Sequence, residues 1–165
     1  MANFLLPMIE RAEGAYELRN VRTGRLVAHT IIPAFESATR RKGLLGRDSL
    51  EDGVAMIIAP SNAIHTFWMR FPIDVAFVRR NGEVVKVQEA LAPWRAAVAV
   101  TAYAAIEFAA GTLRRADVRV GDSLSLKACS DAMDERFELG RLAVVNTASD
   151  DRQVLTAARV NANGY

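Results

Sequence analysis

Cysteine is nearly absent from this chain of 165 residues, in which Cys129 is the only one. A single cysteine excludes an internal disulfide and a cysteine-rich zinc site. The two histidines, His29 and His65, share no helical spacing, so neither a metal site nor a cofactor is predicted. A chain of this length buries about 70% of its unfolded surface, so its core needs no such cross-links.

Long apolar runs and a strong charge imbalance are lacking too. No run approaches the roughly 20 apolar residues of a membrane-spanning helix. The first ten residues have neither the positive segment nor the apolar stretch of a secretory signal, so we expect a cytoplasmic protein. The net charge of +2 is a mild surplus. The one dense basic run, residues 40–42, is typical of the solvated face of a helix, and nucleic acid is therefore not the expected partner.

Motifs for covalent catalysis or phosphate binding are also missing. The sequence has no Gly-x-Ser-x-Gly element, no Walker motif and no dinucleotide-binding glycine pattern. Cys129 lies at the start of a polar tail, where no motif activates it. The sequence therefore favours a binding domain over an enzyme, although it leaves the question of enzymatic activity open.

What is present is the composition of one globular domain, 51% hydrophobic and 24% charged. Short β-branched runs predict most of its structure as strand. We expect two strands within residues 16–32, the second ended by Pro33, and a buried strand within residues 53–59. Residues 73–79 and 83–88 are predicted to form a hairpin through Asn81-Gly82, a pair that tolerates positive φ at both positions. Residues 98–108 and 123–127 are also predicted as strand.

Helix is predicted only over residues 36–45, where Ala38, Lys42 and Leu45 are spaced by three or four positions, and as one turn over residues 111–115. The fold class is therefore α+β, mainly β, with one main helix. We place this domain at residues 16–127. Residues 128–165 form a C-terminal extension with two apolar runs that can pair as a second β-hairpin.

Residues 64–77 are the most informative segment, because ionisable groups interrupt an aromatic and aliphatic run. Buried charges need partners, so these groups either pair with one another or open onto a ligand. If residues 65–70 are extended, His65, Phe67 and Met69 share one face of the strand. We expect Asp74 to accept a charge-assisted hydrogen bond from Arg70 or Arg47.

The order of motifs resembles the domain-of-unknown-function family 192, over about residues 18–126. The resemblance rests on residues 40–47 and 64–77, the hairpin at 81–85, Pro93-Trp94-Arg95, residues 106–111 and Gly121-Asp122. It implies a compact domain whose curved, barrel-like sheet packs against a helix, and it implies no reaction. Many members carry an export signal or lipid anchor that is not seen here. Many have Glu where this chain has Thr39.

The function predicted from these features is a small binding or interaction domain for a small polar or anionic ligand or a partner protein. Its predicted ligand-binding residues combine aromatic area with polar groups: His65, Trp68, Arg70, Asp74, Trp94 and Arg95. The alternative is an enzyme of unknown reaction that uses His65 with Asp74 or Glu107 as acid and base.

Glu107 has two possible settings. It faces solvent, or it points inward, where it pairs with Arg95 or joins a structural polar cluster with Arg47 and Asp74.

A third interpretation of the function is a nucleic-acid-associated regulator. It requires a single basic face made of Arg40, Arg41, Lys42, Arg114 and Arg115.

Overall fold

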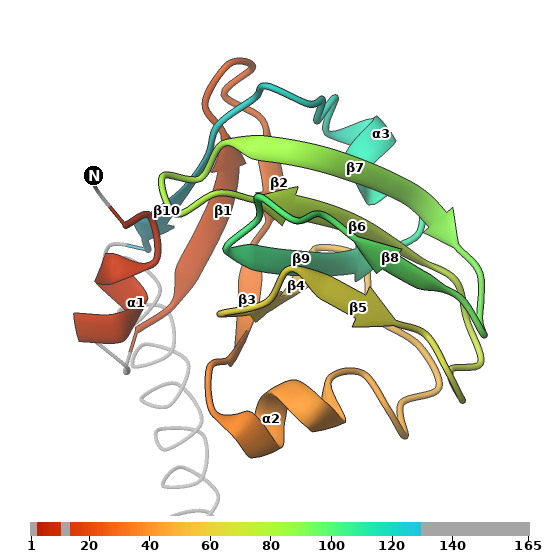
Figure 1. Cartoon of the computed structure of the whole chain (residues 1–165). Helices are drawn as coiled ribbons and strands as arrows, with labels where there is room; N and C mark the ends of the chain where they lie inside the picture. Colours follow the sequence, from red (N-terminus) through yellow and green to blue (C-terminus); the bar gives the residue numbers. More distant parts are fainter. Residues whose placement is uncertain (1–2, 11–13, 130–165) are drawn as a thin grey trace, which may run out of the picture. The chain divides into compact units, whose positions relative to one another are not determined.

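A five-stranded sheet forms the centre of the computed structural model, which describes residues 3–10 and 14–129. Its strands lie in the order β3 (Thr30–Ala34), β4 (Val54–Ile58), β9 (Ala104–Ala109), β6 (Ile73–Val78) and β7 (Val84–Leu91) (Figure 1). β3 and β4 are parallel, and the other neighbours are antiparallel. β9 is the middle strand of the sheet, with β4 and β6 on either side of it.

Two smaller sheets accompany it. One has the order β10 (Leu124–Ala128), β1 (Tyr16–Asn20), β2 (Leu26–Ala28), and the other pairs β5 (Ala63–His65) with β8 (Ala96–Val98). The helices among the described residues are short: α1 (Leu6–Glu10), α2 (Ser37–Lys42) and α3 (Thr112–Arg115). The predicted fold class, α+β and mainly β, is confirmed. Its described strands form three sheets and are not closed into a barrel.

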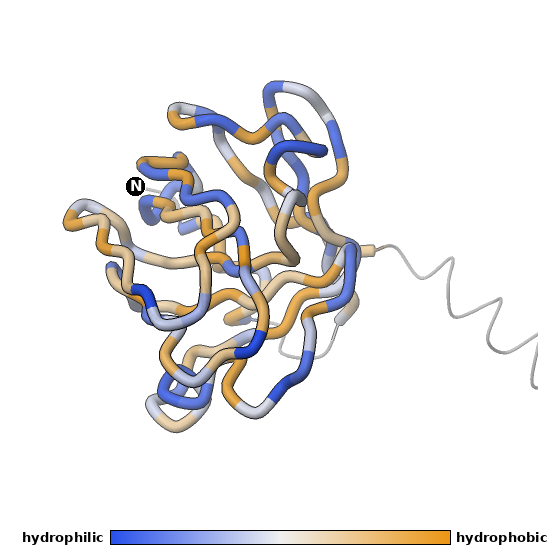
Figure 2. The backbone as a smooth tube through the Cα atoms, turned by 90° about the vertical axis from the view of Figure 1, so that its right-hand side faces the viewer, coloured by the Kyte–Doolittle hydropathy of each residue, from blue (hydrophilic) through white to orange (hydrophobic). Residues whose placement is uncertain are grey.

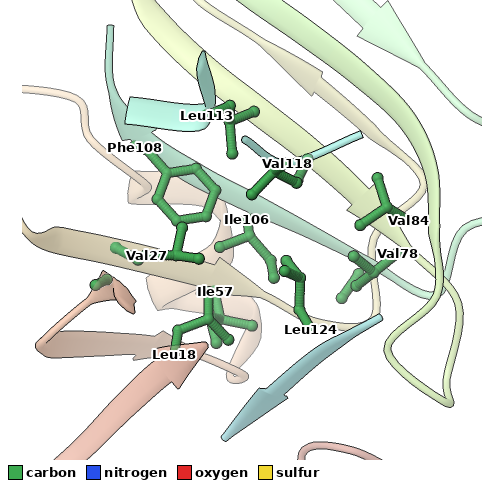
Figure 3. Close-up of a cluster of buried hydrophobic side chains, with 14 of the residues drawn as sticks. Leu18, Val27, Ile57, Val78, Val84, Ile106, Phe108, Leu113, Val118 and Leu124 are labelled. Carbon is green, nitrogen blue, oxygen red and sulfur yellow. The ribbon is translucent and has the colours of Figure 1, made fainter. Parts of the chain in front are cut away.

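Each face of the central sheet carries its own apolar cluster. Along β9, Ile106 and Phe108 belong to the first cluster, which also contains Leu18, Leu113 and Leu124 (Figure 3). Ala105 belongs to the second cluster. Because side chains alternate along a strand, Glu107 lies on the face of the second cluster. By the same alternation along β6, Asp74 lies on the face of the first.

Hydrophobic residues are not confined to the interior, since Figure 2 shows orange stretches in outer loops as well as in the middle of the molecule. Exposed apolar residues are normal for soluble domains, and only their grouping is informative. Among the large exposed ones are Phe67, Trp68 and Trp94, which come from two different loops.

The predicted hairpin between β6 and β7 is confirmed, but its turn differs from the expected one. Only Gly82 has positive φ, at 88°, and the amide of Gly82 donates to the carbonyl of Arg79. Such a type I turn followed by a left-handed glycine is the commonest longer hairpin connection. Asn81 uses its side-chain oxygen instead, accepting a hydrogen bond from the amide of Glu83.

Three further details differ from the sequence prediction. Pro33 does not end its strand, because β3 is an edge strand in which a missing amide donor is tolerated. Residues 98–108 are not one strand: β8 ends at Val98, residues 99–103 form a turn, and β9 begins at Ala104. Helix α1 was not predicted. The extension expected over residues 128–165 lies outside the described residues beyond Cys129, so its hairpin stays a prediction.

None of the helices in the described part of the chain is long and apolar enough to cross a membrane.

Candidate functional site

Thr66 joins the central segment to the loop that follows β7. Its buried hydroxyl donates to the carbonyl of Ala92 at 2.7 Å and accepts from the amide of Arg95 at 3.0 Å. Two backbone hydrogen bonds add to this, from Thr66 N to Arg95 O and from Trp94 N to Thr66 O. These contacts bring residue 66 and residues 92–95 together.

Four rings gather where the two segments meet, and we call His65, Phe67, Trp68 and Trp94 the aromatic surface. His65 stacks on Phe67 with centroids 5.0 Å apart, and the two indoles lie 5.4 Å apart at 60°. Phe67 lies 6.0 Å from each indole. Trp68 is 68% exposed and Trp94 55% exposed. The fold therefore presents its two tryptophans to solvent as a tilted pair.

Both tryptophans have left-handed backbone conformations, with φ 63° at Trp68 and 62° at Trp94. A non-glycine residue in this region costs of order 1–2 kcal/mol. The hydrogen bonds of Thr66 hold both loops in place, and the Met69 amide adds a 3.2 Å bond to the carbonyl of Thr66. The two indoles themselves stay largely exposed, so this backbone geometry holds aromatic area in solvent.

Residues 65–70 do not continue as a strand, which corrects the predicted alternation of faces. β5 ends at His65, and the chain then turns, so that Thr66 and Met69 are buried while Phe67 and Trp68 are exposed. Arg70 pairs with Asp48 at 2.6 Å on the surface. Arg95 is exposed and donates to the carbonyl of its neighbour Trp94 at 3.0 Å.

Asp74 pairs with no arginine among the described residues, so the expected hydrogen bond from Arg70 or Arg47 is wrong. Its carboxylate is fully buried and accepts hydrogen bonds from the amides of Ala90, at 2.8 Å, and Leu113, at 3.0 Å. Helix α3 follows Gly111, which has no side chain to cap it. Asp74 supplies that acceptor from β6, so it connects β6, the end of β7 and α3 and lies away from the aromatic surface.

Glu107 lies in the middle of β9, and its cross-strand neighbours are Met56 and Val75. It is 4% exposed, and its Oε2 has no hydrogen-bond partner among the described residues. Burial in this apolar setting raises the pKa of Glu107 to about 7. Arg47 is exposed beyond α2, so Arg47, Asp74 and Glu107 do not form the polar cluster that the sequence suggested.

A cavity of about 510 Å³ opens between α2, β5 and β9 and is lined by both Glu107 and His65. Its apolar wall comes from the second cluster and consists of Leu44, Ile58, Ile64 and Met69. The three basic residues of α2 also line it. His65 therefore belongs to two places, the cavity and the edge of the aromatic surface.

The basic residues do not merge into one face. Arg40, Arg41 and Lys42 of α2 lie on the side of the second cluster, whereas α3 packs by Leu113 against the first (Figure 1). Arg114 and Arg115 of α3 lie near carboxylates, at 3.8 Å from Glu89 and 2.5 Å from Asp52. Within residues 3–10 and 14–129, no group of three or more side chains could hold a metal ion.

Sequence reasoning did not identify Thr66, Phe67 or the cavity. Thr66 stands between His65 and Phe67 in the sequence, which is only a weak signal. Its structural role depends on its contacts with residues 92–95. The basic run of α2 was interpreted as a solvated face, yet the same residues line a cavity with Glu107. No local pattern links positions 41 and 107.

Two solved structures are similar in fold. One is a "putative transcription regulator" from Sinorhizobium meliloti 1021, with 21% identity, TM-score 0.59, and coverage of 70% of this chain and 92% of that one. The other is a protein of unknown function from Novosphingobium aromaticivorans DSM 12444, with 22% identity, TM-score 0.58, and coverage of 67% and 83%. At these identities the likeness concerns the fold alone.

No curated protein matches the chain. The sequence pattern of DUF192, described as "Uncharacterized ACR", matches residues 9–126. This range contains every described strand except the last two residues of β10, together with the aromatic surface and the cavity. The chain therefore belongs to the uncharacterised DUF192 family.

Proposed function

We propose that this domain binds a small anionic molecule with a flat ring, and that the aromatic surface is where it binds. The observation that carries the proposal is the pair of exposed indoles held at positive φ. Backbone strain that brings no burial in the folded state is typical of functional sites. A ligand that covers Trp68 and Trp94 would bury the indole surface that stays exposed in the folded domain.

The chemistry of the surface supports this class of ligand. Contact between an indole ring and a flat apolar surface is favourable because both leave water, and a tilted pair of indoles can contact a ring on two sides. Arg95 follows Trp94 directly and is exposed, and His65 adds an imidazole at the other end of the surface. Cations beside aromatic rings favour a ring that carries an acidic group.

Tryptophan fluorescence tests the proposal, because both tryptophans of the chain lie in the aromatic surface. We would titrate the full chain with nicotinate and benzoate, and with their neutral counterparts nicotinamide and benzamide. The acidic probes should quench or shift the emission at lower concentration than the neutral ones. Trp68→Phe and Trp94→Phe assign the signal to one indole or the other.

Affinity then decides which side chains matter, measured by calorimetry. Trp68→Ala and Trp94→Ala should each weaken binding of the acidic probe by about tenfold, the equivalent of about 1.4 kcal/mol. Arg95→Gln should remove the preference for acidic over neutral probes. Val120→Ala, an exposed apolar residue outside the surface, is the matched control. No response to any of the four probes, or an equal loss with Val120→Ala, contradicts the proposal.

An acid–base enzyme is the second candidate, and one observation favours it: His65 and Glu107 line the same cavity. A carboxyl group with a pKa near neutrality suits proton transfer. Turnover of nitrophenyl acetate and nitrophenyl phosphate by the full chain would test it. A rate that is lost in both His65→Ala and Glu107→Gln supports this candidate, and the absence of turnover contradicts it.

A nucleic-acid-associated regulator receives less support. The Sinorhizobium neighbour carries the name of a regulator, but the likeness extends only to the fold. The basic residues of α2 and α3 lie on opposite faces of the central sheet, so they offer no continuous path for a phosphate backbone.

A further inference from the structure

The aromatic surface leaves Glu107 unexplained. A buried carboxyl group without a partner destabilises the folded state, and an alanine occupies the equivalent position two residues earlier on the same strand face. Neither cross-strand neighbour, Met56 or Val75, offers a hydrogen bond. The folded domain therefore gains nothing from the carboxyl group at this position.

The same cavity contains basic groups that are also unpartnered. The guanidinium of Arg40 donates to the carbonyl of Phe35 and to Ser37 Oγ. Arg41 and Lys42, in contrast, have no side-chain hydrogen bond or ion pair within the described part of the chain, although both line the cavity. Among the described residues none of these basic groups forms an ion pair with Glu107, whose Oε2 has no hydrogen-bond partner.

We propose that the cavity between α2, β5 and β9 binds a small molecule with an anionic group at one end and a hydrogen-bond donor at the other. The anionic group lies against Arg41 and Lys42, and the donor, an amine or a hydroxyl, bonds to the carboxyl group of Glu107. The apolar wall of Leu44, Ile58 and Ile64 covers the carbon chain between them. This site shares His65 with the aromatic surface, but its two ends are formed by other residues, so it does not rest on the proposed function.

An amine and a hydroxyl would act on Glu107 differently. A bound ammonium group favours the ionised carboxylate, so it lowers the pKa of Glu107 and releases a proton on binding below about pH 7. A hydroxyl bonds to the neutral acid and releases none. The charged and titratable groups that line the cavity besides Glu107 are Arg40, Arg41, Lys42 and His65.

Matched probes test the site by calorimetry on the full chain. The probes are ε-aminocaproate, ε-hydroxycaproate and caproate, which differ only in the donor, with the shorter γ-aminobutyrate, γ-hydroxybutyrate and butyrate as a second series. In at least one series the two donor-bearing probes should bind about tenfold tighter than the plain acid, the usual worth of a hydrogen bond to a charged or buried partner. Repeating the titration in two buffers of different ionisation enthalpy measures the proton release, which only the amine should cause.

Variants then assign the two ends. Glu107→Met, close to glutamate in volume, should abolish the preference for donor-bearing probes. Glu107→Gln should abolish the proton release, whereas His65→Ala should leave it in place. Arg41→Gln and Lys42→Gln should weaken all probes. Glu89→Gln and Arg47→Gln, which remove a surface charge outside the cavity, are the matched controls.

Three outcomes would overturn the inference. They are equal affinity for plain and donor-bearing acids in both series, a donor preference that survives Glu107→Met, and no binding of any probe at millimolar concentrations. The first and third need no variant, so a misfolded variant cannot hide them. Trp68→Phe and Trp94→Phe should leave these affinities unchanged, which separates this site from the proposed function.

Discussion

Replacing Glu107 with glutamine should make the domain more stable at neutral and alkaline pH. The carboxyl group has an ordinary pKa near 4.5 in the unfolded chain and one of about 7 in the folded domain. Between these values the folded state binds more protons than the unfolded state. The free energy of unfolding of the natural chain therefore falls as the pH rises through this window.

The size of the effect follows from the separation of the two pKa values. One pKa unit corresponds to about 1.4 kcal/mol, so the full window is worth about 3 kcal/mol. Glutamine has nearly the same shape and no charge. The natural chain and Glu107→Gln should be similar in stability at about pH 4, and the variant should be more stable by up to about 3 kcal/mol at about pH 8.

Urea denaturation followed by far-ultraviolet circular dichroism, at a series of pH values, measures this difference. Several other carboxyl groups also titrate, among them Asp117 and Asp122, whose pKa values are lowered. The difference between chain and variant cancels their contribution. Glu89→Gln, an exposed carboxylate on β7, should show no comparable divergence. A gap between natural chain and Glu107→Gln that does not grow with pH would refute the reasoning.

Three other substitutions test hydrogen bonds and a turn elsewhere in the fold. Asp74→Ala leaves the amides of Ala90 and Leu113 without their acceptor and should destabilise the domain by about 3 kcal/mol, measured by urea denaturation; an unchanged midpoint would contradict it. Gly82→Ala should destabilise by more than about 1 kcal/mol, because φ is 88° and the new Cβ would lie 2.3 Å from the carbonyl oxygen of Leu124. Gly24→Ala, with positive φ but open space, is its control and should cost less. Asp122→Asn should make the free energy of unfolding depend less on pH between about 4 and 2. A hydrogen bond from Arg22 lowers the pKa of Asp122 to about 2, so the stability that this carboxylate contributes is lost as the pH falls through that range. Thermal melts of the natural chain and the variant would show the same pH dependence if that bond were absent.

Local signals in the sequence were enough to predict most elements. Asn81-Gly82 between β-branched runs predicted the β6–β7 hairpin, and the apolar run after Gly53 predicted β4. The start of α2 next to Glu36 and the helical turn after Gly111 were predicted as well. These features depend on turn chemistry and side-chain alternation over a few residues, which the sequence displays directly.

The sequence also indicated that residues 64–77 and Trp94 belong together, but only tertiary structure decided how. Extended alternation was wrong for residues 65–70, because Thr66 donates a hydrogen bond to Ala92 and accepts one from Arg95, and the chain turns there. The period of a strand holds only while the strand continues, and its end was set by a partner nearly thirty residues away.

Partners of the buried carboxylates depended most on the tertiary structure. The sequence correctly indicated that Asp74 needed a partner, and the fold chose backbone amides of Ala90 and Leu113 over any arginine. Glu107 Oε2 has no hydrogen-bond partner within the described residues, and the carboxyl group lines a cavity together with Arg41 and Lys42. Sequence determines that a buried charge must be satisfied. Which atoms satisfy it depends on the distant segments that sheet register and packing bring to the same face.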